Sequence, residues 1–169
     1  MKNISARNLG LITGGLMIAA TLVMYYLLKM PEAGTSKYVC YGIYSTGILL
    51  SLFNYYGKEN VEKNTKSFFS EGFKTFVVVV FLMAVFGFIF YKLNPQIFEA
   101  RLADINAINS KDPNKTAAEV VENSNRLKNI FIPMTVAINT VLYLIIGALI
   151  SFIAAAFLAN KYQNKIQNS

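Results

Sequence analysis

The chain has 169 residues and a net charge of +7, and 54% of its residues are hydrophobic while 15% are charged. A soluble domain carries about a quarter charged residues, and here the shortfall comes from long uncharged stretches, which indicates a membrane protein. The absence of histidine and the presence of one cysteine exclude His-dependent catalytic relays, His metal sites and an internal disulfide.

The first two apolar stretches cover residues 9–28 and 38–57, and neither contains a charged residue. Each corresponds to about 30 Å of helix, which is enough to cross the hydrocarbon core of a bilayer. The first stretch exceeds the usual length of a signal-peptide core, and no Ala-x-Ala site follows it. We therefore interpret it as a retained signal anchor.

A charged connector over residues 58–74 leads to the third apolar stretch, residues 75–91. Phe69, Phe73 and Phe76 recur at helical spacing, which predicts an amphipathic segment at the membrane interface. A plain loop with aromatic anchors explains the first half of the connector equally well. The third stretch is rich in β-branched and aromatic residues, but its length and lack of alternation favour a membrane helix.

The polar segment 93–130 predicts a helical loop. Asn94 and Pro95 have the form of a helix cap followed by proline at the first helical position. Apolar residues then form one helical stripe: Phe98, Leu102, Ile105 and Ile108. Thr116 and Glu119 form a capping box, and the helix that it opens can run without a break into the last apolar stretch.

The last uncharged stretch, residues 130–159, is longer than the hydrocarbon core, so it tilts or its first turn, near Pro133, lies outside the core. We place the fourth span at 133–159. The predicted fold is all-α: one membrane domain over residues 1–169, a four-helix transmembrane bundle with a helical extracytoplasmic extension between spans three and four.

Four spans put both termini on the same side of the membrane. Eight of the sixteen basic residues fall on each side, but those on the terminal side lie closer to span ends. Because basic residues near span ends favour the cytoplasm, we expect cytoplasmic termini and a cytoplasmic connector.

Small residues recur at four-residue intervals in the first and fourth spans, a spacing that lets membrane helices approach closely. The stripes predict that these two spans pack tightly, within the chain or between copies. Small residues are also common in membrane helices by chance. The residues concerned are Gly10, Gly14, Gly15, Ala19, Gly147, Ser151 and Ala155.

No ionisable residue lies well inside a predicted span, which disfavours ion-coupled transporters and voltage sensors, and channels less strongly. Four polar residues of spans two and four need an explanation. They line a small cavity or, as we favour, form hydrogen bonds between helices. They are Asn54, Asn139, Thr140 and Tyr143.

The acidic residues of the polar segment follow no metal-ligand or paired-carboxylate spacing, and no phosphate-binding loop or nucleophile elbow is present. The sequence therefore predicts no catalytic, cofactor-binding or metal-binding residues, and no nucleic-acid module. These acids, interpreted as solvated helix faces, are Glu99, Asp104, Asp112, Glu119 and Glu122.

Three features of the chain occur together: basic residues before a Gly-rich first span, the segment 67–74 (SFFSEGFK) and the segment 94–99 (NPQIFE). Together they resemble a bacterial family of small four-span membrane proteins, catalogued as domain of unknown function 4199. The resemblance covers nearly the whole chain and implies a bacterial inner-membrane location, but no activity.

The functional hypothesis is a non-enzymatic, structural or accessory membrane protein whose outer helical loop binds a partner. The alternative is a small transport or permeation component that works as an oligomer. Expected partners are the lipid bilayer and a second copy or another membrane protein.

Overall fold

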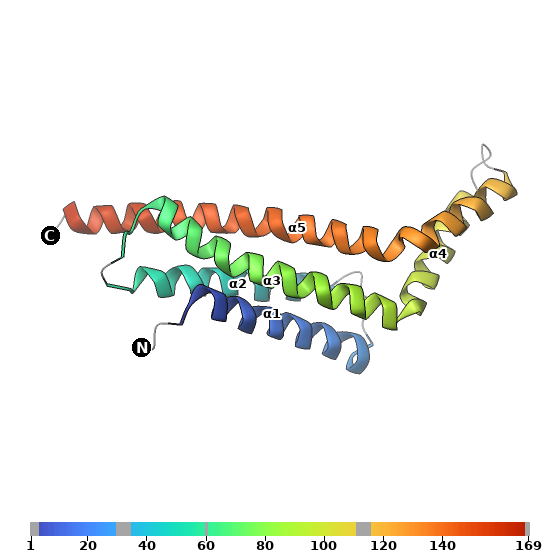
Figure 1. Cartoon of the computed structure of the whole chain (residues 1–169), viewed down its shortest axis with the longest axis horizontal. Helices are drawn as coiled ribbons and strands as arrows, with labels where there is room; N and C mark the ends of the chain where they lie inside the picture. The colour runs from blue at the N-terminus through green and yellow to red at the C-terminus, as the bar shows by residue number, and fades with distance from the viewer. Residues whose placement is uncertain (1–3, 30–34, 60, 111–115, 168–169) are drawn as a thin grey trace. The chain divides into compact units, whose positions relative to one another are not determined.

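The computed structural model describes residues 4–29, 35–59, 61–110 and 116–167, with the side chains of Thr35 and Ala117 left aside. These residues form helices joined by turns and contain no strand, in agreement with the all-α prediction (Figure 1). The elements are α1 (Ala6–Leu22), η1 (Val23–Leu27, a π-helical turn), α2 (Thr35–Tyr56), α3 (Thr65–Leu93), α4 (Pro95–Asn109) and α5 (Ala117–Gln167).

Three helices are long and apolar enough to cross a membrane: Ala6–Leu27, which joins α1 to η1, then Thr65–Leu93 and Ala118–Gln167. These match the first, third and fourth predicted spans. The second predicted span is α2, which has 22 residues. In proportion to its length, it carries more hydroxyl and amide side chains than the three helices above.

Helices α3 and α5 begin well before the apolar stretches that predicted them, because polar caps start each helix early. The Asn64 side chain accepts a hydrogen bond from the Ser67 main-chain N–H at 2.8 Å, so the second half of the connector belongs to α3. The capping box of α5 is present, with Thr116 N–H donating to Glu119 Oε2 at 2.7 Å and Glu119 N–H donating to Thr116 Oγ1 at 3.3 Å.

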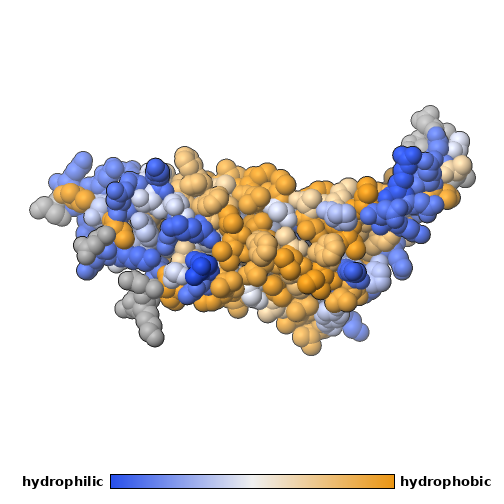
Figure 2. Space-filling view, viewed as in Figure 1, coloured by the Kyte–Doolittle hydropathy of each residue, from blue (hydrophilic) through white to orange (hydrophobic). Residues whose placement is uncertain are grey.

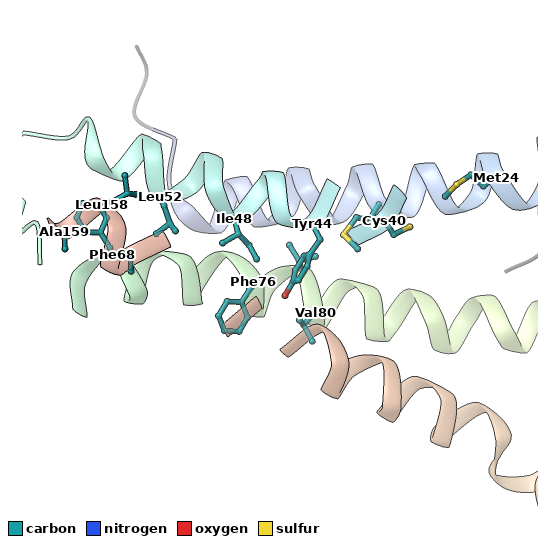
Figure 3. Packing of buried hydrophobic residues seen from close by; sticks show 13 residues of the cluster. Met24, Cys40, Tyr44, Ile48, Leu52, Phe68, Phe76, Val80, Leu158 and Ala159 are labelled. Atoms are coloured by element: carbon teal, nitrogen blue, oxygen red, sulfur yellow. The ribbon is translucent and has the colours of Figure 1, made fainter. Parts of the chain in front are cut away.

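The chain divides into two compact units, Met1–Met83 with Thr140–Ser169, and Ala84–Asn139. The core of the first unit takes side chains from α1, η1, α2, α3 and α5 (Figure 3). Within it, Tyr44, Ile48 and Leu52 follow one face of α2 and have no exposed surface. This spacing turns one face of α2 toward the core, while Leu50 and Phe53 on its other side are exposed.

Aromatic rings and polar contacts between helices stabilise the second unit. Phe131 on α5 lies 4.7 Å from Phe98 on α4 and 6.2 Å from Tyr91 on α3, measured between ring centroids. The Ser124 hydroxyl donates to Asn106 Oδ1 at 2.6 Å. The predicted apolar stripe of α4 is thus buried at its start, whereas Ile108 at its end is 70% exposed.

Asn94 separates α3 from α4, and it does so differently from the predicted cap. Its side chain makes no capping hydrogen bond to α4. Its Nδ2 group instead donates to the Phe90 carbonyl at 2.9 Å, so the side chain binds the end of the preceding helix. Pro95 takes the first position of α4, as its sequence predicts.

Candidate functional site

The outer surface of α5 carries a continuous row of exposed apolar side chains. Figure 2 shows hydrophobic surface over the middle of the first unit and hydrophilic surface where α2 ends and α3 begins. The row spans about 24 Å of helix, and basic residues continue it. In water such an exposed apolar row would be unfavourable, whereas contact with lipid tails would be compatible with it. Its members, 53–66% exposed, are Val141, Ile145, Leu149, Ile153 and Phe157, followed by exposed Lys161 and Lys165.

Close helix contacts in the first unit join α2 to α1, where a methyl group added at Gly47 would meet Thr13, and join α3 to its neighbours. A methyl group added at Gly10 would lie 2.8 Å from the Thr75 carbonyl oxygen, and one added at Gly14 would lie 2.7 Å from Leu82. On the other side of α3, a methyl group added at Gly72 would lie 2.6 Å from the Ser151 hydroxyl. These distances leave no room for a Cβ atom, so glycine sets the spacing of the helices.

Within the chain, the small-residue stripes of spans one and four have neighbours on α2 and α3. The nearest atoms to Gly10 and Gly14 belong to α3, and those to Gly147 belong to Tyr44 and Phe76 on α2 and α3. Tight packing of these two spans between copies stays a prediction. The stripes divide further. Ala155 is fully buried in the core, whereas Gly15 has no neighbour within 4 Å and Ala19 is exposed. The spacing of small residues along one helix does not specify which other helix packs against them.

A buried chain of hydroxyl groups joins three helices at one end of this unit. The Thr75 hydroxyl lies 2.7 Å from the Ser51 hydroxyl, 3.3 Å from the Ala6 carbonyl oxygen and 3.1 Å from the Glu71 carbonyl oxygen. The single hydroxyl hydrogen of Thr75 thus has three acceptors within reach. Both Thr75 and Ser51 are almost completely buried, so this polar contact links α1, α2 and α3 where water does not compete.

Glu71 is a buried carboxylate that sequence analysis did not single out. It is 7% exposed, and its two oxygens each lie 3.3 Å from an ammonium group, one of Lys58 and one of Lys74. Its position on the helix could have indicated its burial, because residues three or four apart lie on the same face. Phe68 and Thr75, three residues before and four after Glu71, have no exposed surface. The apolar face predicted from Phe69, Phe73 and Phe76 does not include Glu71, and of these three phenylalanines only Phe76 is buried.

The Ser151 hydroxyl is a buried oxygen without a hydrogen-bond partner among the residues that the structure describes. It faces the Cα of Gly72, which offers no donor or acceptor side chain. Such an unpaired hydroxyl is unfavourable by about 1–3 kcal/mol relative to a paired one. The close approach of α3 and α5 at this level accounts for its position, since Ser is nearly as small as Ala.

The four predicted polar residues take part in separate contacts. Asn54 Nδ2 donates to the Ile4 carbonyl at 2.6 Å, whereas the Tyr143 carbonyl accepts a hydrogen bond from Tyr44, ten residues before Asn54 on α2. Ten residues of helix correspond to about 15 Å. Thr140 and Asn139 are half-buried. The Asn54 contact joins α2 to the segment before α1, the Tyr143 contact joins α2 to α5, and a cavity lined by all four residues stays a prediction.

The end of the first unit where α2 ends combines aromatic rings with basic side chains, and we call it the aromatic–basic end. The Lys63 ammonium lies 4.7 Å from the ring centroid of Tyr162 and 5.6 Å from that of Tyr56. The Tyr55 hydroxyl donates to the Glu62 carbonyl at 3.1 Å, which holds the connector against α2. The members of this end are Tyr55, Tyr56, Lys58, Lys63, Phe68 and Tyr162.

Two acidic residues of the polar segment have structural contacts, whereas Glu99 and Asp104 are exposed on α4. Glu119 belongs to the α5 capping box, and Glu122 pairs with Arg126 at 2.7 Å on the exposed side of α5. Asp112 lies outside the described residues. Across the described ranges, no three Cys, Asp or Glu side chains come together as metal ligands.

Comparisons with known proteins place the chain in one family. A family model described as "Protein of unknown function (DUF4199)" matches residues 8–160, which run from the start of α1 almost to the end of α5. No curated protein and no solved structure matches the chain. Because the matched region includes nearly all of the described helices, the chain belongs to this family of proteins of unknown function, DUF4199.

Proposed function

We propose that this chain is a four-span protein of the bacterial cytoplasmic membrane with a non-enzymatic, structural or accessory role, and with both termini in the cytoplasm. The observation that carries the proposal is the contrast within the first unit. Its outer surface on α5 carries an apolar row suited to contact with lipid. Its interior contains close contacts at glycines and polar groups that are hydrogen-bonded to each other.

The burial pattern of α2 supports its assignment as a span in addition to the three longer helices. Its inner face is buried, and its outer face carries exposed apolar residues, among them Leu50 and Phe53. A helix lying outside the membrane would turn a polar face outward, whereas a helix in lipid is apolar on both faces. With 22 residues, α2 is about 33 Å long, which matches the hydrocarbon thickness.

The polar groups inside the unit support a structural role over a catalytic one. Thr75 and Ser51 bond to each other, Asn54 bonds to the main chain, and the Glu71 charge is balanced by two lysines. Groups committed to such contacts specify how helices pack. Exposed apolar side chains on the polar segment, including Ile108 and Val121, support a partner-binding surface there.

The topology is tested by single cysteines in a Cys40→Ser background, labelled with an impermeant maleimide on spheroplasts and after lysis. Lys37→Cys and Asn125→Cys should react on intact spheroplasts, whereas Glu59→Cys and Gln163→Cys should react only after lysis. If Lys37→Cys and Glu59→Cys react from the same side, α2 does not cross the membrane. If the two pairs exchange behaviour, the orientation is reversed.

A permeation role is the second candidate, and the outward position of Gly15 and Ala19 favours it. Small exposed residues on a membrane helix offer a close-packing surface to a second copy. Solute flux into reconstituted vesicles separates the two candidates. Flux above that of protein-free vesicles would support permeation, whereas a stoichiometric membrane partner retained after gentle solubilisation, without flux, would support the accessory role.

A further inference from the structure

Lys63 is held in a defined place by two aromatic rings. Its ammonium lies over Tyr56 from α2 and Tyr162 from α5, and these two rings are in edge contact at 6.2 Å. Cation–π contacts fix the position of an ammonium group without neutralising its charge. Its hydrogen-bond donors remain able to bind an anion.

The other lysines nearby differ from Lys63 because they share a carboxylate. Lys58 and Lys74 both contact Glu71, whereas of the carboxylates that the structure describes, none is paired with Lys63. Exposed Lys66 follows Lys63 in the chain, and exposed Lys161 precedes Tyr162. Glu59 and Glu62 also belong to this connector, and the Glu62 carboxylate accepts a hydrogen bond from Asn64 Nδ2 at 3.1 Å. The aromatic–basic end keeps a net positive charge, because five lysines (Lys58, Lys63, Lys66, Lys74 and Lys161) lie there with three glutamates (Glu59, Glu62 and Glu71).

The α5 row places this charge at the level of lipid headgroups. Ile153 and Phe157 are each 66% exposed, and Lys161 follows at the same four-residue spacing. The change from apolar to basic on one helix face marks the edge of the hydrocarbon core. Tyr162 is the next residue, so the Lys63 ammonium that contacts its ring lies just beyond this edge.

We propose that the aromatic–basic end binds the headgroup of an anionic phospholipid, with Lys63 contacting the phosphodiester. This inference rests on the membrane embedding proposed above and adds the class of lipid. A glycerol headgroup leaves the phosphate charge unbalanced, so Lys63 gains a full electrostatic contact. A choline headgroup carries its own cation, which competes with Lys63 for the phosphate.

The test counts lipids bound to the purified full-length protein by native mass spectrometry during titration with phosphatidylglycerol or phosphatidylcholine. The unmodified protein should prefer phosphatidylglycerol, and the preference should fall as salt rises. Lys63→Gln should weaken phosphatidylglycerol binding about five-fold, the value of one lysine at an anionic surface. Lys63→Arg and Tyr162→Phe, which keep the charge and the ring, should retain binding.

Lys128→Gln is the matched control, because it removes the same charge from an exposed position of α5 in the second unit. An equal loss of phosphatidylglycerol binding in this control would show that the effect depends only on net charge, and it would overturn the proposal. Absence of a lipid preference in the unmodified protein at low salt would also overturn it, whether or not the Lys63→Gln protein folds.

Two further outcomes would identify a different ligand, and a third would test the membrane embedding. Displacement of lipid by an equal concentration of inorganic phosphate would identify a free anion as the ligand. An acidic protein that co-purifies with the unmodified chain, and is lost in Lys63→Gln without a change in lipid binding, would identify a protein site. Either result overturns the lipid assignment. Extraction of the chain from membranes by alkaline carbonate would instead refute the membrane embedding itself.

Discussion

The Tyr44 hydroxyl on α2 donates its hydrogen to the Tyr143 main-chain carbonyl on α5, across 2.8 Å. In an α-helix that carbonyl also accepts the N–H of residue 147. Residue 147 is glycine, and a methyl group there would meet the Tyr44 hydroxyl and lie 2.8 Å from Cγ of Phe76. Figure 3 shows Tyr44 and Phe76 beside each other in the core. Glycine at 147 is therefore what gives a side chain of α2 access to the main chain of α5.

Gly147→Ala should destabilise the protein by about 1–3 kcal/mol, because the added methyl group forces Tyr44 or Phe76 to move within a packed core. The measurement is unfolding in detergent micelles followed by circular dichroism. Gly15→Ala is the matched control, since position 15 has no neighbour within 4 Å, and it should leave stability unchanged or slightly raise it. Equal effects of the two substitutions would contradict the proposed contact.

Thr75→Val should lower stability by about 1 kcal/mol, because it preserves the shape of the side chain and leaves the Ser51 hydroxyl and the Ala6 carbonyl without their shared partner. A double-mutant cycle with Ser51→Ala measures the coupling directly. Thr46→Val is the control, since the exposed Thr46 hydroxyl bonds only to its own helix at Gly42. A coupling energy near zero would show that the hydroxyl chain does not stabilise the fold.

Glu71→Gln should couple more strongly to Lys58→Gln than to Lys74→Gln. The Lys58 side chain is 20% exposed and that of Lys74 is 60% exposed, so solvent screens the second ion pair more. We expect a coupling energy of about 1 kcal/mol for Lys58 and less than about 0.5 kcal/mol for Lys74. Two equal couplings, measured by unfolding of all single and double variants, would argue against the difference in burial.

Ser151→Ala should leave stability unchanged or raise it by up to about 1 kcal/mol, because it removes a buried hydroxyl that has no partner among the described residues. Ala155→Ser provides the comparison, since it places a hydroxyl at another fully buried position of α5 and should destabilise the protein. A clear loss of stability on Ser151→Ala would mean that the hydroxyl is hydrogen-bonded, for example through a bound water molecule.

Local patterns in the sequence were sufficient for much of the fold. Uncharged length predicted four spans, three of which are helices long and apolar enough to cross a membrane, and the Thr116 and Glu119 pair predicted the start of α5. These features depend on residues within one or two helical turns. The early start of α3 depends on Asn64, a cap that lies inside a charged stretch and carries no apolar signal of its own.

The candidate site could not be predicted in the same way, because it depends on which face of each helix meets a neighbour. Glu71 lies among lysines in the sequence and reads as a solvated residue, yet α3 turns it toward Lys58 and the interior. Likewise, Gly15 and Gly14 are adjacent in sequence, but only Gly14 touches another helix. Rotation of a helix about its axis is a tertiary property.

The hydroxyl chain also has a consequence for how the protein is made. Ser51 and the Ala6 carbonyl leave the ribosome long before Thr75, the residue that joins them. A nascent chain that has released only α1 and α2 exposes these polar groups to lipid, together with the glycine face that later meets α3. Insertion of α3 thus covers this face of α1 and α2, and α5, which follows α3 in the chain, completes the core.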